Sequence, residues 1–237
     1  MRIILARHGE TDYNKNKLVQ GHTDIPLNEE GISQGIAAGK KIEGYTIDVA
    51  YSSTLGRAFD TARYMLDNSN SEENKNLSVI KDKRLIEKSY GEYEGVSFAE
   101  YGAGLKAGET RGMELDSDAA DRVEAFFKEK HEEHPDKTIL AVCHGGLIRS
   151  FLTQKGIKEV GRGVIVNTSV SVLDYDGERF ELIEFTEEGF KAVLTQAPYR
   201  VSAMKEGDEG EYTVNDVTDW IIYTDEMSID PNTAYLL

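Results

Sequence analysis

Cysteine is almost absent from this chain of 237 residues: Cys143 stands alone, so no internal disulfide can form and a disulfide framework is excluded. Basic side chains are also few, because 27 Lys and Arg face 43 Asp and Glu and leave a net charge of −16. A chain this acidic repels nucleic acids and anionic membrane surfaces, which argues against both as partners. No apolar run approaches the roughly 20 residues that cross a bilayer.

The N-terminal segment is too short for an export signal. The apolar run that follows Met1 ends at Arg7, whereas a signal sequence needs about 7 to 15 apolar residues. We therefore expect a cytoplasmic protein. The 39% hydrophobic content suffices for a buried core, and the length favours one large domain. All of the excess negative charge lies after Leu66, so we expect any anion site to be built from the neutral N-terminal third.

Apolar runs alternate with amphipathic helical patterns along the chain, which is typical of an α/β fold. The continuous apolar runs at residues 3–6 and 139–143 suit central parallel strands covered on both faces. We predict strands at 3–6, 47–51, 77–80 and 139–143, helices at 28–42, 54–66 and 117–134, and a hairpin at 168–175 and 179–185. The expected architecture has three layers, α/β/α, with a mostly parallel central sheet.

The domain prediction is a single unit over residues 1–237. A small cap is expected between Glu87 and Asp136, with residues 88–135 as its insertion and a lid within 96–110. Residues 68–76 are polar and predict a surface loop. Residues 186–237 form an acidic C-terminal extension, irregular apart from a possible helix at 213–224. This extension could pack on its own domain or on a second copy, and the latter would give a homodimer.

Two histidines each follow a predicted strand. His8 comes after the first strand and His144 after the strand at 139–143. Because ligands of open α/β sheets bind outside the carboxyl ends of the strands, we expect both histidines in one crevice. The helix that begins near Gly145 would aim free backbone amides at an anion there.

Three further features point to phosphate. Arg57 lies in the first turns of a predicted helix, where its guanidinium can bind two phosphate oxygens. Glu87 precedes a turn rich in Gly and Tyr. Asn14 and Gln20 lie in the loop after the first strand, and both can donate amide hydrogens to phosphoryl oxygens.

Five separated motifs together resemble the histidine phosphatase superfamily, which includes the cofactor-dependent phosphoglycerate mutases. They are Arg7 to Thr11 with Asn14; Gln20 and Gly21 with Asp24, Pro26, Leu27 and Gly31; Ser52 to Ala62 around Arg57; Glu87 with Gly91 and Gly95; and His144 to Arg149. The resemblance spans residues 1 to about 185. Gly35 and Lys88 depart from the residues that are usual at these positions.

The resemblance implies an enzyme with a phosphohistidine intermediate. His8 would be the nucleophile and Glu87 the general acid and base. Arg7, Arg57 and His144 would neutralise the phosphoryl oxygens. The expected phosphate-binding residues are Arg7, Asn14, Gln20, Gly21, Arg57, His144 and Gly145. Neither a metal nor a cofactor is required, because the arginines and histidine supply the positive charge.

The resemblance leaves three functions to compare. Only 56 residues separate Glu87 from His144, whereas the mutases carry a long insertion there, so we favour a phosphatase that hydrolyses a small phosphorylated metabolite. A cofactor-dependent phosphoglycerate mutase is the first alternative. The second is a non-catalytic phosphate-binding regulatory domain.

Other side chains have ordinary structural interpretations. His131 and His134 could bind a metal, but a solvated helix end is the simpler interpretation. Cys143 suits inert burial, and Glu10 suits a structural role because a carboxylate opposes phosphate binding. Tyr90, Tyr93 and Tyr101 could form a wall for the leaving group or belong to the core.

Overall fold

A computed structural model describes residues 1–157, 165–187, 190–193, 200–205 and 208–213. The strands are β1 (Arg2–Arg7), β2 (Val49–Ser52), β3 (Val79–Lys81), β4 (Thr138–Cys143), β5 (Val170–Tyr175), β6 (Phe180–Glu187), β7 (Phe190–Val193), β8 (Arg200–Lys205) and β9 (Asp208–Thr213). The α-helices are α1 (Asp12–Lys15), α2 (Glu29–Ala37), α3 (Gly56–Asp67), α4 (Glu72–Lys75), α5 (Phe98–Lys106), α6 (Asp116–Glu133) and α7 (Gly145–Gln154). Short 3₁₀ helices are η1 (Ala38–Ile42), η2 (Lys83–Leu85) and η3 (Gly91–Tyr93).

The central sheet contains seven strands in the order β3-β2-β4-β1-β5-β6-β7. The first four pair in parallel, and each later strand pairs antiparallel with its neighbour, so five of the seven run in one direction. The mostly parallel sheet is therefore confirmed. The predicted hairpin is also present, since β5 and β6 join at Asp176, whose carboxylate accepts from the amide of Arg179 at 2.7 Å.

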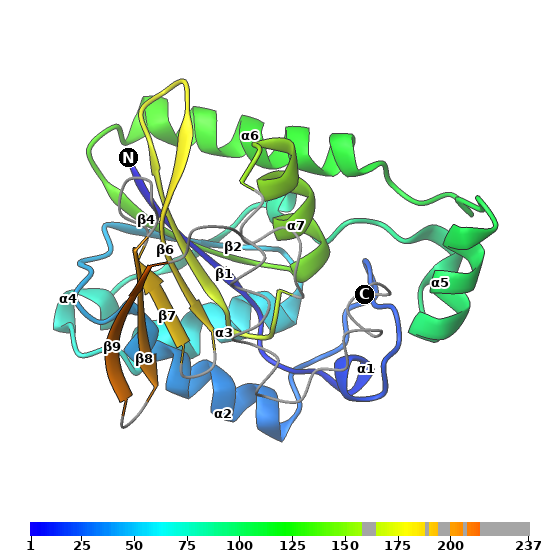
Figure 1. Cartoon of the computed structure of the whole chain (residues 1–237), viewed down its shortest axis with the longest axis horizontal. Helices are drawn as coiled ribbons and strands as arrows, with labels where there is room; N and C mark the ends of the chain where they lie inside the picture. Colours follow the sequence, from blue (N-terminus) through cyan, green and yellow to red (C-terminus); the bar gives the residue numbers. More distant parts are fainter. Residues whose placement is uncertain (158–164, 188–189, 194–199, 206–207, 214–237) are drawn as a thin grey trace.

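Helices cover both faces of the sheet (Figure 1), as the three-layer prediction requires. α2 and α3 lie on one face, where Ala58, Ala62 and Met65 pack against β1 and β4. α6 and α7 lie on the other, where Phe126, Phe127 and Phe151 form one core cluster. β1 and β4 are buried from both sides, which explains why their sequences are continuously apolar.

Local capping explains where several helices begin. The side chain of Asn28 accepts from the amide of Gly31 at 2.8 Å and starts α2, as the sequence predicts. Ile36 in this helix is 43% exposed although it belongs to the apolar pattern. The predicted surface loop at 68–76 contains α4, and Asn74 within it is buried because its side chain bonds the backbone of Ile47 and Tyr45.

The segment predicted as a cap divides into two parts. α5 extends beyond the body of the molecule and covers one end of the sheet (Figure 1). α6 instead lies in the layer over the sheet, with Ala120, Val123, Phe126 and Phe127 buried as predicted. The part of 88–135 that lies outside the layered body therefore ends near the start of α6.

The C-terminal part is more regular than the sequence predicts. β7 extends the central sheet at its edge, and β8 and β9 pair as a separate ribbon beside it. The predicted helix at 213–224 lies outside the described residues, apart from Thr213 at the end of β9.

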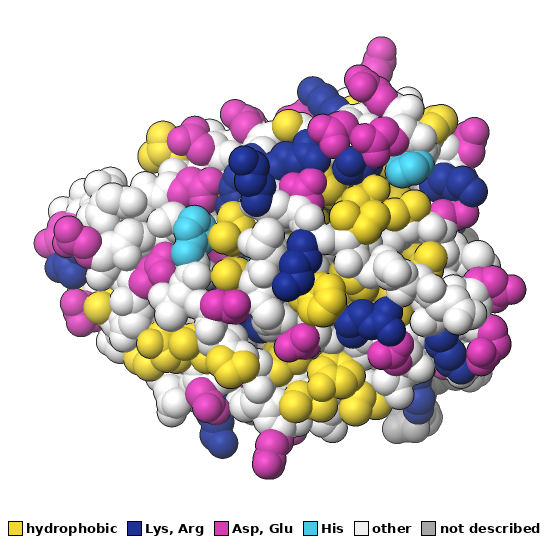
Figure 2. Space-filling view, turned by 180° about the vertical axis from the view of Figure 1, so that it is seen from behind, with side chains coloured by type: hydrophobic (Ala, Val, Ile, Leu, Met, Phe, Trp, Pro, Cys, Tyr) yellow, Lys and Arg dark blue, Asp and Glu magenta, His cyan; other side chains and the backbone are white. Residues whose placement is uncertain are grey.

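Charges are interspersed over the surface seen in Figure 2. Acidic and basic side chains alternate there, with hydrophobic groups in separate small patches. Within the described ranges, every helix is too short or too polar to cross a bilayer.

Candidate active site

A cavity of about 300 Å³ opens at the carboxyl ends of β1 and β4. Eight of the nine predicted site residues line it: Arg7, His8, Asn14, Gln20, Gly21, Arg57, Glu87 and Gly145. The ninth, His144, lies directly behind His8, with the ring centroids 5.1 Å apart. The two histidines therefore meet at one sheet edge as expected, although only His8 lines the cavity.

His8 is oriented by its own backbone. Its Nδ1 donates to the carbonyl oxygen of Gly9 at 2.6 Å, so Nε2 carries the lone pair. Burial, followed by the positive charges of Arg57 and Arg7, lowers the pKa of His8 well below its usual 6.5. The imidazole is thus neutral at pH 7, which is the form that can attack an electrophile.

His144 is completely buried, and neither of its ring nitrogens has a hydrogen-bond partner. Burial lowers its pKa well below 6.5, with the charges of Arg57 and Arg7 contributing further. A buried polar group without a partner is costly, so these two nitrogens are candidates for bonding a ligand.

Two arginines bring positive charge to the cavity. Arg7 ends β1, donates from its guanidinium to the carbonyl of Ile165, and has an unpartnered, buried Nε. Burial lowers its pKa to about 10, so it stays charged. Arg57 is also fully buried with an unpartnered Nε, and its guanidinium donates to the carbonyls of Gly21 and Thr23, each at 2.8 Å.

The amides of Asn14 and Gln20 are turned by Thr11, which caps α1. Asn14 Oδ1 accepts from the backbone amide of Thr11 at 3.2 Å, and Gln20 Oε1 accepts from its hydroxyl at 2.9 Å. With both oxygens engaged, the Nδ2 and Nε2 groups are the ends left to donate to a ligand. This is the orientation that the phosphate-binding prediction needs.

The Glu87 carboxylate lies at the N-terminus of α7. Oε1 accepts from the amides of Lys88 and Leu147, each at 2.8 Å, whereas Oε2 accepts only a longer bond of 3.2 Å from Gly146. Arg122 and His22 in turn bond the backbone carbonyl of Glu87. The side chain is therefore fixed in the cavity wall, with Oε2 as its less engaged oxygen.

The sequence analysis gave no role to three further residues of the site. Asn167 donates from Nδ2 to the carbonyl of His8 at 2.9 Å and so supports the backbone of His8. Lys17 and Arg149 add two cations to the lining. Arg149 could have been predicted from the sequence, because it belongs to the motif from His144 to Arg149. Asn167 lies in a loop that has no sequence motif, so nothing in the sequence indicates its contact.

Aromatic side chains form part of the wall. Tyr90, Phe98 and Tyr101 line the cavity, whereas Tyr93 is buried behind Tyr101 with ring centroids 5.3 Å apart. Glu10 has the structural role expected of it, because it accepts from the Asn28 side chain at 2.9 Å.

Cys143 is buried as expected, and burial raises its pKa. The less favoured metal-site interpretation of His131 and His134 gains no support, since the described part of the chain contains no group of three side chains suited to hold a metal ion.

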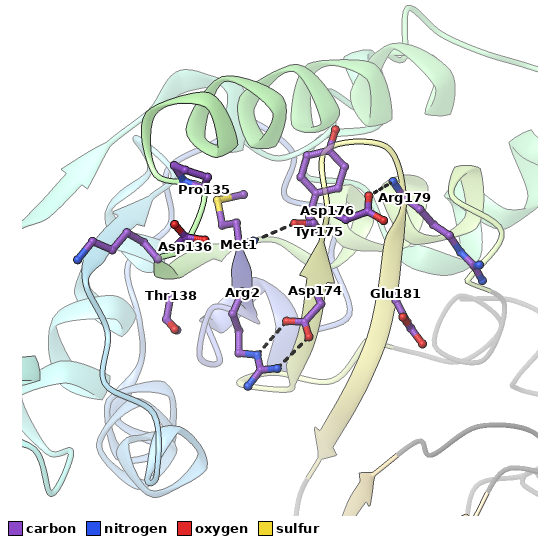
Figure 3. Close-up of a pocket in the computed structure, with 11 residues that line it drawn as sticks. Met1, Arg2, Pro135, Asp136, Thr138, Asp174, Tyr175, Asp176, Arg179 and Glu181 are labelled. Carbon is purple, nitrogen blue, oxygen red and sulfur yellow. Dashed lines mark hydrogen bonds and ion pairs between the residues drawn. The ribbon is translucent and has the colours of Figure 1, made fainter.

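A second cavity, of about 500 Å³, lies at the opposite end of β1 and β4 (Figure 3). Two charged side chains of its lining bond one another: the Arg2 guanidinium donates to both carboxylate oxygens of Asp174, at 2.9 and 2.8 Å. The Asp176 side chain accepts from the Arg179 backbone amide. Although larger, this cavity contains none of the predicted site residues.

Comparison with known proteins agrees with this geometry. The family model described as "Histidine phosphatase superfamily (branch 1)" matches residues 3–188. Among curated proteins, the uncharacterized phosphatase PhoE of Bacillus subtilis is 29% identical over 185 residues, covering 77% of this chain and 93% of that protein. A 2,3-bisphosphoglycerate-dependent phosphoglycerate mutase of Borreliella burgdorferi is 39% identical over 104 residues, covering 43% of this chain but only 41% of the mutase.

Solved structures show the same fold. A phosphoglycerate mutase from Bacillus anthracis aligns with a TM-score of 0.69 at 26% identity, covering 77% of this chain and 91% of that one. A mycobacterial glucosyl-3-phosphoglycerate phosphatase, described in complex with VO3, aligns with a TM-score of 0.63 at 30% identity, covering 76% and 96%. With the family model spanning most of the sequence, this chain belongs to the histidine phosphatase superfamily, branch 1.

Proposed function

We propose that this chain is a metal-independent phosphomonoesterase that hydrolyses a small phosphorylated metabolite in the cytoplasm through a phosphohistidine on His8. One observation carries the proposal. Of the five buried side-chain nitrogen and oxygen atoms without a partner among the described residues, four belong to Arg7, Arg57 and His144, around the neutral His8. Unpartnered N–H groups of these side chains, buried beside a neutral imidazole and a cavity, suit a tetrahedral anion.

In the first step, the lone pair of His8 Nε2 attacks phosphorus and the ester P–O bond breaks. Arg7, Arg57 and His144 stabilise the charge on the equatorial oxygens. Glu87 gives a proton to the departing alkoxide. We assign that proton to Oε2, because Oε1 already accepts two short backbone bonds.

In the second step, water attacks the phosphohistidine and the P–N bond breaks. Glu87, now a carboxylate, takes the proton of the water, which restores both it and the neutral imidazole. Inorganic phosphate leaves the cavity. Two arginines and a helix N-terminus provide the charge stabilisation that the two steps require.

The relatives suggest which substrates to test first. A phosphatase for glucosyl-3-phosphoglycerate and mutases for phosphoglycerate are among the similar proteins. We therefore place phosphorylated sugar acids first in a panel of phosphate esters, with sugar phosphates and nucleotides after them.

The test is hydrolysis of p-nitrophenyl phosphate and of this panel in the presence of a chelator, with acid-labile phosphate trapped on the protein. Hydrolysis that survives chelation, with label on His8, supports the proposal. Absence of any turnover while phosphate still binds would favour the non-catalytic regulatory domain.

A phosphoglycerate mutase is the second candidate, because mutase relatives are 39% and 40% identical to this chain over 104 and 102 residues, which cover 41% and 40% of their own length. It predicts that, with a bisphosphorylated primer present, isomerisation of phosphoglycerate outpaces its hydrolysis. The shortness of the segment between Glu87 and His144 favours hydrolysis instead.

A further inference from the structure

Arg57 is held in place by a backbone loop. Its guanidinium donates to the carbonyl oxygens of Gly21 and Thr23, each at 2.8 Å, and it is completely buried. The nearest carboxylate oxygen in an ion pair is that of Asp24, at 4.0 Å. The position of the guanidinium at the cavity therefore depends on the conformation of residues 21–24.

Glu94 binds the other side of the same loop. Its Oε1 accepts from the amide of His22 at 3.0 Å, and its Oε2 accepts from the amide and hydroxyl of Thr23, at 3.1 and 2.9 Å. The amide of His22 and the carbonyl of Gly21 belong to one peptide group. That peptide group therefore lies between a carboxylate and a guanidinium, and each charge strengthens the bond to the other.

We propose that Glu94 is a positioning residue, which fixes the Arg57 guanidinium at the phosphate site by holding the peptide groups of residues 21–24. The inference rests on the proposed function, because it assigns a purpose to the phosphate-binding arginine. Glu94 itself does not line the cavity. It supplies negative charge from behind the loop, where it stabilises a buried guanidinium without facing the anionic ligand.

Two further observations fit this role. Gly21 has a φ of +56°, and a Cβ there would overlap the Glu94 carboxylate, so a glycine allows the close approach. Burial lowers the pKa of Arg57, and the negative charge of Glu94 is among those that oppose this shift. The two side chains are thus coupled electrostatically as well as through the peptide.

The segment around residues 21–24 also contacts the chain on either side of Glu94, including Glu87, the proposed general acid. Nε2 of His22 donates to the backbone carbonyl of Glu87 at 2.8 Å. The amide of Gly95 also donates to the carbonyl of Val19 at 2.8 Å. The backbone amide of Tyr90 donates to Oε1 of Glu94 over a longer distance of 3.4 Å. The shorter bonds of Glu94 therefore go to His22 and Thr23 rather than to its own turn.

The experiment compares Glu94→Gln with Glu92→Gln, an exposed residue of the same turn. Glutamine keeps the shape of Glu94 but replaces one acceptor oxygen by a donor and removes the charge. We expect Glu94→Gln to weaken binding of inorganic vanadate and of inorganic phosphate by about tenfold, as expected for loss of a charge-assisted hydrogen bond. Glu92→Gln should bind both as the unaltered protein does.

A double-mutant cycle separates positioning of Arg57 from a general structural role. In an Arg57→Lys background, Glu94→Gln should weaken vanadate binding less than about twofold, because the guanidinium it positions is gone. An equal loss in both backgrounds, or no loss in Glu94→Gln alone, would overturn the proposal. If Glu94→Gln does not fold, Thr23→Val takes its place, since it removes only the hydroxyl bond to Oε2 and should weaken binding in the same direction.

Binding of vanadate and phosphate is measured by calorimetry, so the result does not depend on turnover. If the unaltered protein binds neither anion, the proposed function fails. If it binds both and Glu94→Gln binds them equally well, only the role of Glu94 fails.

Discussion

The two cavities at opposite ends of β1 and β4 share strands but differ in how their charges are satisfied. The larger one, beside Met1, pairs Arg2 with Asp174 across neighbouring strands. The smaller one, beside His8, leaves buried nitrogens of Arg7 and Arg57 without partners. Volume alone would not single out the cavity that we propose as the active site. Unsatisfied buried donors support our choice of the cavity beside His8 as an anion site, because such costly groups are commonly retained where a ligand completes them.

The largest expected effect is that of His8→Ala. Without the imidazole no phosphohistidine forms, so kcat for p-nitrophenyl phosphate should fall by at least about 10⁴-fold. Arg2→Ala in the other cavity is the matched control and should keep full activity. Undiminished turnover in His8→Ala would remove the distinction between the two cavities.

Glu87→Gln should show a dependence on the leaving group. An alkyl phosphate requires a proton on the departing oxygen, so its hydrolysis should fall by about 10³-fold. p-Nitrophenolate leaves without a proton, so phosphorylation of His8 by that ester should be nearly unchanged in a single-turnover burst. Equal losses for both substrates would assign the proton to another group.

Arg57→Lys should lower kcat/KM by about 10²-fold, because an ammonium cannot reproduce the fixed geometry of the guanidinium in the transition state. Arg63→Lys, on the same helix α3, is the control: Arg63 bonds the carbonyl of Leu77 and the carboxylate of Asp67 away from the cavity. A comparable loss in Arg63→Lys would show that the effect arises from α3 itself.

The part of this site that lies at strand ends was predictable from the sequence. A continuous apolar run identifies a buried strand, and the residue that ends it must reach the sheet edge, which places His8 and His144 correctly. Asn167 was not predictable, because its contact with the carbonyl of His8 spans 159 positions and depends on how the chain returns to the sheet.

The fold was predictable to a similar limit. Periodicity gave the helices that pack on the sheet, because burial of one face imposes that pattern. It failed for Asn74, whose burial depends on two backbone partners near β2. It also failed for β8 and for β9, and in β9 acidic residues mask the alternation of a strand.

Acid should lower the free energy of unfolding, because of the two histidines at the smaller cavity. The pKa values of His8 and His144 lie well below 6.5 in the folded chain, mainly because of burial, so below pH 6.5 only the unfolded chain binds these protons. The contribution of these two histidines to the free energy of unfolding is therefore fully present above pH 6.5 and falls as the pH is lowered. The free energy of unfolding is measured in urea at several pH values between 7.5 and 5.5. His144→Asn should reduce the slope of this free energy against pH by up to about 1.4 kcal/mol per pH unit. Tyr90→Phe, which adds or removes no group that titrates there, should keep the original slope.

The smallest effect is expected in the larger cavity. Arg2 and Asp174 are 40% and 43% exposed, so solvent screens their pairing despite its two short bonds. Arg2→Met should lower the free energy of unfolding by about 1 kcal/mol or less, and a double-mutant cycle with Asp174→Asn should give a coupling of similar size that weakens in salt. Hydrolysis should be unchanged, because Arg2 and Asp174 bond one another at the end of β1 opposite to His8. A loss of activity in Arg2→Met, with the fold intact by circular dichroism, would mean that a change at one end of β1 affects the cavity at its other end. The presence or absence of partners for the charged groups would then no longer distinguish the active site from the other cavity.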